Sequence, residues 1–490
     1  MDSHILTSLM TTKNIQREPA QSAELVRGIT LPGAVSLNMI AMIGVGPFIT
    51  IPLIVAAMGG PQAMLGWIFG ALLVICDGLV WAELGAALPT SGGSYRYLKT
   101  IYDPARLGKL MAFLFIWQLT FSAPLSIASG CIGLAQYAAF LFPALTTTYW
   151  QGNLHLIGAS FAVTPATFVA MGTCVIAMVL LYRNVTIISR ITEYLWVGVM
   201  LTIAWVIVSG VTHFDSARAF DFPQGAFALS FNFFNGLGAA MLIAVYDYWG
   251  YYAVCFVGAE VRDPGRTIPR AILYSIFLVA IIYLVMNISI LGVIPWQELN
   301  ETANSDARRY IISVFMQRLY GNWAGNVAAI LIMWTAFASV FSLLLSYSRV
   351  PYAAAVDGDY FKSFSRIHSQ HRFPNVSLVV MGSLAVFFCL LRLQDVIAAL
   401  VVIRLMVQFL AQIIGVILFR IRRPDVPRPF KMWLYPLPAV FALVGYLYVL
   451  VMRRDFTKEL QYGFVILILG GTFFFLRNWK RKEWPFSPSF

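Results

Sequence analysis

The sequence predicts an all-α polytopic membrane protein with about twelve transmembrane helices. Of its 490 residues, 59% are apolar and only 11% are charged, whereas about a quarter of the residues of a soluble domain are charged. The apolar residues form blocks of about 20 or more, the length with which a helix crosses a hydrocarbon core of about 30 Å. This composition excludes a soluble enzyme and a nucleic-acid-binding protein.

The predicted spans are separated by short polar connections, none of which is long enough to form a separate soluble domain. The two longest connections, 212–235 and 295–322, are expected to hold short helices at the membrane surface. The sequence carries no motif typical of a catalytic, metal or cofactor site, so we expect no enzyme activity, no metal and no cofactor. The approximate spans are 32–58, 62–87, 110–140, 161–181, 191–211, 236–258, 271–294, 324–355, 376–391, 395–419, 434–452 and 459–477.

The basic residues predict that both termini lie in the cytoplasm. The first 30 residues are polar and lack the short apolar core of a signal peptide. With the N-terminus inside, the cytoplasmic segments carry 25 Lys and Arg residues and the opposite loops carry 8, and such an excess marks cytoplasmic loops. The net charge of +12 is therefore interpreted as a topology signal in a plasma-membrane protein (the inner membrane in a bacterium) and does not indicate a nucleic-acid partner.

The centre of the first span is expected to be interrupted, because it reads Gly44-Val45-Gly46-Pro47-Phe48. Glycine loosens the helical backbone, and proline lacks an N–H group. In lipid, such a break is tolerated only where it is buried in protein or lines a cavity. The free amides of a half-helix suit an anion such as a carboxylate. The alternative is a proline kink with small residues at a close helix crossing.

The sixth span also carries a disturbed centre, Tyr246-Asp247-Tyr248-Trp249-Gly250-Tyr251. A carboxylate at mid-depth is costly unless it is paired or hydrated, so Asp247 is a candidate site for an amine or a proton. The aromatic rings could stack on a ligand; the alternative is an aromatic belt at the membrane interface. Two breaks at corresponding positions of successive five-helix groups are typical of an inverted-repeat transporter with its site at the midplane.

Four further stretches, together with the first break, carry a resemblance. They are Ala82-Glu83-Leu84-Gly85 with Pro89, Ser91-Gly92-Gly93 and Tyr95-Arg96-Tyr97; Glu260-Val261-Arg262-Asp263-Pro264 with Thr267 and Pro269-Arg270-Ala271-Ile272; Ser348-Arg349-Val350 through Asp357-Gly358 with Pro374; and Arg422-Arg423-Pro424 with Arg428-Pro429. In these stretches the chain resembles the amino acid–polyamine–organocation permeases, from about Gly28 to Pro438.

The resemblance implies a LeuT-type fold, with five plus five helices in inverted repeat and two additional C-terminal helices. The corresponding division is a cytoplasmic segment 1–30, repeats 31–211 and 212–419, two helices in 420–477 and a cytoplasmic tail 478–490. The implied function is secondary active transport of amino acids or related amines, including polyamines, by alternating access. The alternatives are an exchanger of the same substrates and a non-transporting amino acid sensor.

The resemblance also implies roles for the two breaks. Gly44, Val45 and Gly46 would receive a substrate carboxylate, Tyr246 would pack over the ligand, and the backbone from Asp247 to Gly250 would face an ammonium group. Many proton-coupled members carry a lysine in helix five, where this chain has Val199, so the coupling ion stays open between H⁺ and Na⁺. The predicted substrate-binding residues are Gly44, Val45, Gly46, Pro47, Phe48, Tyr246, Asp247, Tyr248, Trp249, Gly250 and Tyr251.

Four other polar residues inside predicted spans are candidates for ion coupling. Asp77 could carry a proton and Arg404 could be a fixed charge, or the two could pair with each other or with Asp247 as buried ions. Ser339 and Ser342 are candidate Na⁺ ligands, although hydroxyl groups in membrane helices more often bond to the backbone of their own helix. The expected partners are thus a small amino acid or amine, H⁺ or Na⁺, and membrane lipid.

Overall fold

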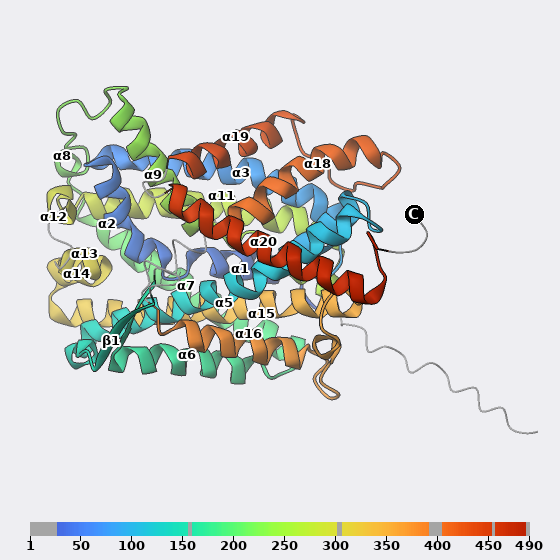
Figure 1. Ribbon diagram of the computed structural model, residues 1–490. Coiled ribbons are helices and arrows are strands. Elements are labelled where there is room, and N and C mark those ends of the chain that lie inside the picture. Colours follow the sequence, from blue (N-terminus) through green and yellow to red (C-terminus); the bar gives the residue numbers. More distant parts are fainter. Residues whose placement is uncertain (1–26, 155–158, 301–305, 392–403, 453–455, 487–490) are drawn as a thin grey trace, which may run out of the picture.

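The structure is a bundle of long helices that lie roughly side by side (Figure 1). This computed structural model describes residues 27–154, 159–300, 306–391, 404–452 and 456–486. Among these residues, five helices are long and apolar enough to cross a membrane, and a bent pair forms a sixth span. The five are α3 (Met64–Ala87, preceded by a short turn from Pro61), α5 (Leu107–Leu141), α7 (Val185–Thr212), α11 (Pro264–Leu291) and α15 (Asn322–Val356); the bent pair is α1 (Leu31–Ile43) and α2 (Gly46–Met58).

Six further helices of the described residues belong to the bundle. They are α6 (Pro165–Leu181), α9 (Phe231–Tyr248), α16 (Asn375–Phe388), α18 (Ala411–Arg422), α19 (Leu437–Val451) and α20 (Phe456–Arg481). A π-helical turn, Leu405–Leu410, leads into α18, and the beginning of the predicted span 395–419 lies outside the described residues. The total of twelve spans and the inverted repeat stay predictions.

The sequence-based expectation of a purely helical chain is wrong at one place. Residues Trp150–Leu154 (β1) and Ala159–Val163 (β2) pair as an antiparallel two-stranded sheet, with Trp150 opposite Val163. The fourth predicted span therefore begins later than residue 161. Thr164 and Thr167 form a capping box, and Pro165 occupies the first turn, so the local sequence ends the strand and begins α6 at this point.

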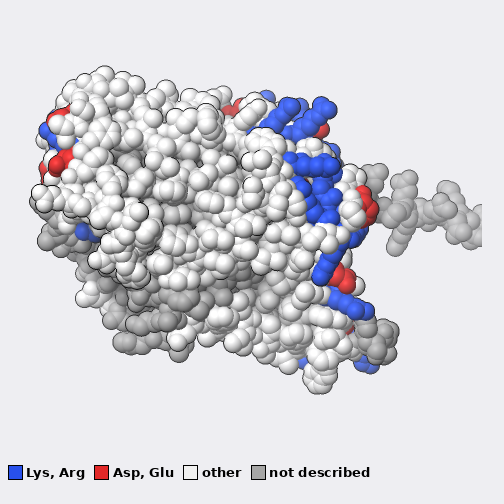
Figure 2. Space-filling view, turned by 90° about the horizontal axis from the view of Figure 1, so that it is seen from above, with Lys and Arg blue, Asp and Glu red and all other residues white. Residues whose placement is uncertain are grey.

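The long connections hold short helices at one end of the bundle, as the sequence predicts. They are α8 (Ser216–Ala219), α12 (Trp296–Asn300), α13 (Asp306–Arg309) and α14 (Ile311–Tyr320). Lys and Arg residues gather at the opposite end, and the broad middle of the surface is almost free of charge (Figure 2). This distribution is that of a membrane-crossing bundle with one basic end.

The basic end also contains a network of ion pairs. Asp357, which directly follows α15, accepts hydrogen bonds from Arg96 (2.6 Å) and Lys99 (2.8 Å) of α4 (Ser94–Ile101). Burial by itself would raise the pKa of Asp357, but the hydrogen bond from Lys99 and the nearby positive charges outweigh it and hold the pKa below its ordinary value. The network fastens α4 to the end of α15.

Small residues bring the helices around the first span close together. Gly66 and Gly70 on α3 face Ala240 and Ala244 on α9, a close approach that is typical of helix packing in membranes. α3 also packs along α11, α5 packs along α15, and α1 lies against both α11 and α15. The packing places the predicted break of the first span in the middle of the bundle.

Candidate functional site

The first predicted break is present between α1 and α2. The two helices meet at an angle of 46°, and Gly44 has a φ of 31°, which favours glycine. The Gly44 N–H lies at a long 3.4 Å from the Ile40 carbonyl. In the described part of the chain, the N–H groups of Val45 and Gly46 have no hydrogen-bond acceptor. These two amides form the free N-terminus of α2, the kind of site that attracts an anion.

The second predicted break lies between α9 and α10 (Ala253–Phe256). The backbone is unwound after Tyr248, and Gly250 has a φ of 129°. A Cβ atom at this glycine would lie 2.6 Å from the carbonyl carbon of Ala41, which is shorter than a van der Waals contact between carbon atoms. Glycine is therefore required at this position, and the two breaks touch each other.

Side chains from neighbouring helices hold the two breaks together. The Tyr283 hydroxyl on α11 lies 2.9 Å from the Met42 carbonyl oxygen and 3.2 Å from that of Asp247, and it donates to both in a shared bond. The Asn38 side-chain oxygen accepts from the N–H of Val254 at 3.0 Å. Tyr283 and Asn38 are not among the site residues predicted from the sequence. The sequence marks each of them only as a polar side chain within an apolar block. Many buried polar residues of the bundle have this feature, so it does not single out these two.

Asp247 lies at the junction of the breaks and is 2% exposed. Its Oδ2 atom accepts a hydrogen bond from Thr50 of α2. Its Oδ1 atom has no hydrogen-bond partner in the described structure, and it lies against Gly46, where a Cβ atom would collide with it. Glycine at position 46 thus makes room for the carboxylate. An unpartnered carboxylate oxygen at this depth is costly in the absence of a ligand or proton.

Arg404 contributes a buried positive charge and is also 2% exposed. Its guanidinium donates to the hydroxyl groups of Ser126 (2.8 Å) and Tyr252 (3.2 Å). It also lies 5.4 Å from the ring centre of Trp249 and 5.3 Å from that of Tyr347. No carboxylate of the described residues is within ion-pairing distance of it. The alternative in which Arg404 pairs with Asp77 or Asp247 is therefore wrong for this structure.

The breaks and these two charges surround one narrow cavity of about 50 Å³. This volume holds a few water molecules at about 10–15 Å³ each, so a larger ligand requires the cavity to widen. The Ser339 hydroxyl lines it from α15, and Tyr246 is held at its edge by a 3.2 Å hydrogen bond to Ser129. The predicted residues that line the cavity are Gly44, Val45, Gly46, Tyr246, Asp247, Trp249, Ser339 and Arg404.

Other predicted site residues lie outside the cavity wall. The Ser342 hydroxyl donates to the Leu37 carbonyl oxygen of α1 at 3.0 Å, a backbone bond to another helix and not the bond to its own helix that was the expected alternative to Na⁺ binding. Tyr248 packs against Trp67 with 5.8 Å between ring centres. Tyr248, Trp249 and Tyr251 of the second break are buried and Tyr246 is partly buried, which argues against an interfacial belt. The predicted residues outside the wall are Pro47, Phe48, Tyr248, Gly250, Tyr251, Asp77 and Ser342.

Asp77 forms a separate buried cluster on α3. Its Oδ2 atom accepts a hydrogen bond from Tyr251 of the second break, and Oδ1 has no partner in the described structure. Trp81 and Tyr446 lie against the same carboxylate. The cluster therefore connects a buried carboxyl group to the unwound backbone at Tyr251. The next residue, Tyr252, accepts a hydrogen bond from Arg404. Within the described ranges, no group of His, Cys, Asp or Glu residues could hold a metal ion.

Comparison with known proteins gives a consistent result. Residues 29–474 match the family model described as amino acid permease. The chain is 25% identical over 466 residues to a branched-chain amino acid permease of Bacillus subtilis, covering 92% of this chain and 93% of the relative. It is also 25% identical over 466 residues to a serine/threonine exchanger of Bacillus subtilis (94% and 98% covered).

A human relative covers nearly the same range. The cystine/glutamate transporter of Homo sapiens is 27% identical over 466 residues, covering 94% of this chain and 87% of the relative. These relatives are transporters or exchangers of amino acids by name, and the family match extends through both helix breaks and most of the bundle. The chain belongs to the amino acid permease family, as the motif resemblance implied, and is a multi-pass membrane protein.

Proposed function

We propose that the protein is a secondary active transporter of zwitterionic amino acids in the plasma membrane and that it works by alternating access. One observation carries this proposal: Asp247 and Arg404 place opposite, mutually unpaired charges in a single cavity between two broken helices. A zwitterion would compensate both charges at once. The transporter names of the relatives support the reaction class.

The geometry suggests how an amino acid binds. Its carboxylate would lie near the free amides of Val45 and Gly46, with Arg404 as a second positive group. Its ammonium group would face the unpartnered oxygen of Asp247. Tyr246 and Trp249 line the same cavity and would cover the aliphatic part of the substrate. Each polar end of the substrate thus meets a buried group of complementary charge.

A polyamine fits this cavity less well. It carries several positive charges and no anion, so it would leave the buried guanidinium of Arg404 uncompensated beside another cation. That arrangement is costly in a low-dielectric interior. Asp247 alone would favour an amine, and the position of Arg404 shifts the preference towards an amino acid.

The two repeats, 31–211 and 212–419, would rock around this site. Each begins with a helix broken at the cavity, so a change in the angle between half-helices opens the site without unfolding either group. Asp77 is the proposed proton-coupling group, because it is a buried carboxyl group bonded to Tyr251 in the unwound segment. The helices in 420–477 would support the bundle from outside. The basic end and both termini would face the cytoplasm.

The test combines binding and transport. Purified protein is screened by thermal shift with amino acids and polyamines, because a ligand that binds the folded state raises its apparent stability. The ligands found are then tested for uptake into sealed proteoliposomes. We expect zwitterionic amino acids to stabilise the protein and to be transported, and Arg404→Gln to abolish both effects.

Other outcomes separate the alternatives. Stabilisation only by polyamines would overturn the assignment of the substrate. Binding without uptake would indicate a sensor on the same scaffold. Uptake that occurs only into vesicles preloaded with amino acid would indicate an obligate exchanger.

A further inference from the structure

A second and larger cavity lies at the basic end of the bundle. Its volume is about 850 Å³, within the range of about 300–1,000 Å³ that is usual for small-molecule sites. It lies between α5, α20 and the segment that follows α15, well separated in sequence from the helix breaks. None of the residues in the candidate amino acid site lines it.

One wall of this cavity is aromatic. Phe473 of α20 stacks on Phe113 and Trp117 of α5, with ring centres 6.1 and 5.6 Å away. Phe473 is nevertheless 40% exposed, and Phe361 on the opposite side is 58% exposed. One turn before Phe473 on the same face of α20, Leu469 is 55% exposed. The cavity is thus open to the surface that faces lipid.

The other wall is basic. Arg477 donates to the backbone carbonyl oxygens of Gly358 (2.7 Å) and Asp359, and Arg481 donates to that of Gly358 at 3.4 Å. Carbonyl groups orient these guanidinium groups without neutralising them. Glu483 approaches Arg481 at 3.9 Å, and the third cation, Lys362, is exposed at the rim.

The carboxylates near this wall are already engaged. Asp359 and Asp357 each accept a hydrogen bond from Lys99, at 2.6 and 2.8 Å. Arg477 and Arg481 are one helical turn apart on α20, so their charges repel each other. The wall therefore carries an excess of positive charge that an anion between Lys362, Arg477 and Arg481 would relieve.

We propose that this cavity binds an anionic phospholipid of the adjacent leaflet. The phosphate lies between the three cations, and an acyl chain runs along Phe473 and Trp117 towards the exposed face of α20. Basic pockets between membrane helices on the cytoplasmic side are suited to anionic head groups. Basic residues that only set the orientation of the chain in the membrane need not lie together. Here three of them line one cavity with several aromatic rings. This site is independent of the proposed amino acid transport.

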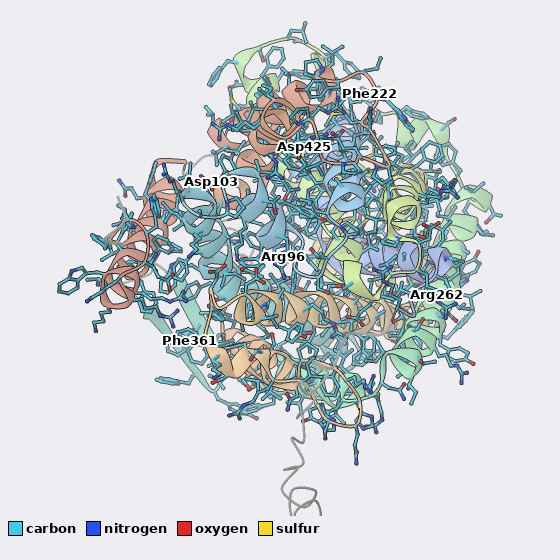
Figure 3. The ribbon with its side chains drawn as sticks, turned by 90° about the vertical axis from the view of Figure 1, so that its right-hand side faces the viewer. Arg96, Asp103, Phe222, Arg262, Phe361 and Asp425 are labelled. Atoms are coloured by element: carbon cyan, nitrogen blue, oxygen red, sulfur yellow. The ribbon has the colours of Figure 1, made fainter. Side chains whose placement is uncertain are left out.

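The experiment measures lipid binding to the full chain, purified in a neutral detergent, by native mass spectrometry and thermal shift. The probes are dioleoylphosphatidylglycerol, dioleoylphosphatidylcholine with the same chains, and inorganic phosphate. The test variant is Arg477→Gln with Arg481→Gln. The matched control is Arg266→Gln with Arg270→Gln, two exposed arginines on α11. Arg262 of the same segment and Phe361 of the cavity lie on different sides of the basic end (Figure 3).

We expect phosphatidylglycerol to bind more tightly than phosphatidylcholine and to stabilise the wild-type protein. The test variant should bind phosphatidylglycerol roughly 25-fold more weakly, at about fivefold for each cation removed, and the control variant should bind it like wild type. Because Arg477 also bonds to the backbone, Lys362→Gln serves as a second variant that leaves these bonds intact, with an expected loss of about fivefold.

Three results would overturn the proposal. The first is equal weakening in the test and control variants, which would indicate general surface attraction. The second is equal protection by inorganic phosphate, which would indicate a site for a free anion. The third is a cross-link through Phe361→Cys to a second copy of the chain, which would show that protein covers the cavity.

Discussion

Individual residues carry the electrostatics of the central cavity. Asp247 and Arg404 are each 2% exposed and line the same space, yet each is held by hydroxyl groups and not by the other. Buried charges of this kind are rare in membrane helices and usually mark a functional site. The prediction from sequence identified both residues, but their separation depends on side-chain positions that the sequence does not encode locally.

Replacing Asp247 by Asn should remove the attraction for an ammonium group while preserving side-chain size and the bond to Thr50. We expect amino acid binding to weaken roughly 10- to 100-fold, the range for loss of one charge-assisted hydrogen bond. Ligand-dependent thermal shift measures the effect. Asp425→Asn, at an exposed carboxylate of the basic end, is the control. Unchanged affinity in Asp247→Asn would remove this residue from the site.

Replacing Asp77 by Asn should separate coupling from binding. If this carboxyl group carries the coupled proton, the variant still exchanges external substrate for substrate preloaded inside the vesicles. It loses the uptake that is driven by an inward proton gradient. Both rates are measured in the same proteoliposome preparation. Gradient-driven uptake by the variant at the wild-type rate would contradict a coupling role. Wild-type uptake that does not depend on the proton gradient would contradict it as well.

At the level of the helices, the breaks could be predicted because glycine and proline leave a local signal. The structure ends α1 at Ile43, restarts at Gly46 and unwinds the backbone after Tyr248, in agreement with the sequence analysis. The hairpin of residues 150–163 was missed, because its strands are only five residues each and the second adjoins an apolar helix. The hydrogen bonds from Tyr283 to the Met42 and Asp247 carbonyl oxygens could not be predicted either, because they depend on α11 crossing both breaks.

Removing the Tyr283 hydroxyl should loosen both breaks at once. Tyr283→Phe leaves the Met42 and Asp247 carbonyl oxygens without this donor, so we expect the free energy of unfolding to fall by about 1–3 kcal/mol. Chemical denaturation in detergent measures it, and amino acid affinity should fall in parallel. Tyr274→Phe, on the same helix but 53% exposed, is the matched control and should change neither quantity. Equal changes of stability and affinity in the two variants would show that the Tyr283 hydroxyl does not hold the breaks together.

A buried ion pair connects the short turn after α10, Gly258–Glu260, to α15. Arg349 donates to Glu260 at 2.9 Å, and both side chains are almost fully buried. Arg349→Met should cost about 3–5 kcal/mol of stability because it strands a buried carboxylate. The double variant Arg349→Met with Glu260→Leu should recover much of this loss. A double variant no more stable than the single one would contradict the stranded carboxylate as the cause of the loss.

At the scale of the whole molecule, composition and charge predicted a membrane bundle with one basic end, and the structure has this arrangement. These features are predictable because they depend on sums over many residues. The shape of the cavity depends instead on contacts between distant segments, such as Gly250 against Ala41 and Asp247 against Gly46.

The most direct test of the central claim is whether a transported amino acid occupies the space between the two breaks. In a background where Cys76, Cys131, Cys174, Cys255 and Cys389 are replaced, Ser339→Cys places a thiol on the cavity wall, and Ser365→Cys serves as a control in the second cavity. The rate of alkylation is measured with and without substrate. We predict that the amino acid slows alkylation at position 339 and leaves position 365 unchanged. Equal rates at position 339 with and without a saturating transported amino acid would contradict the account.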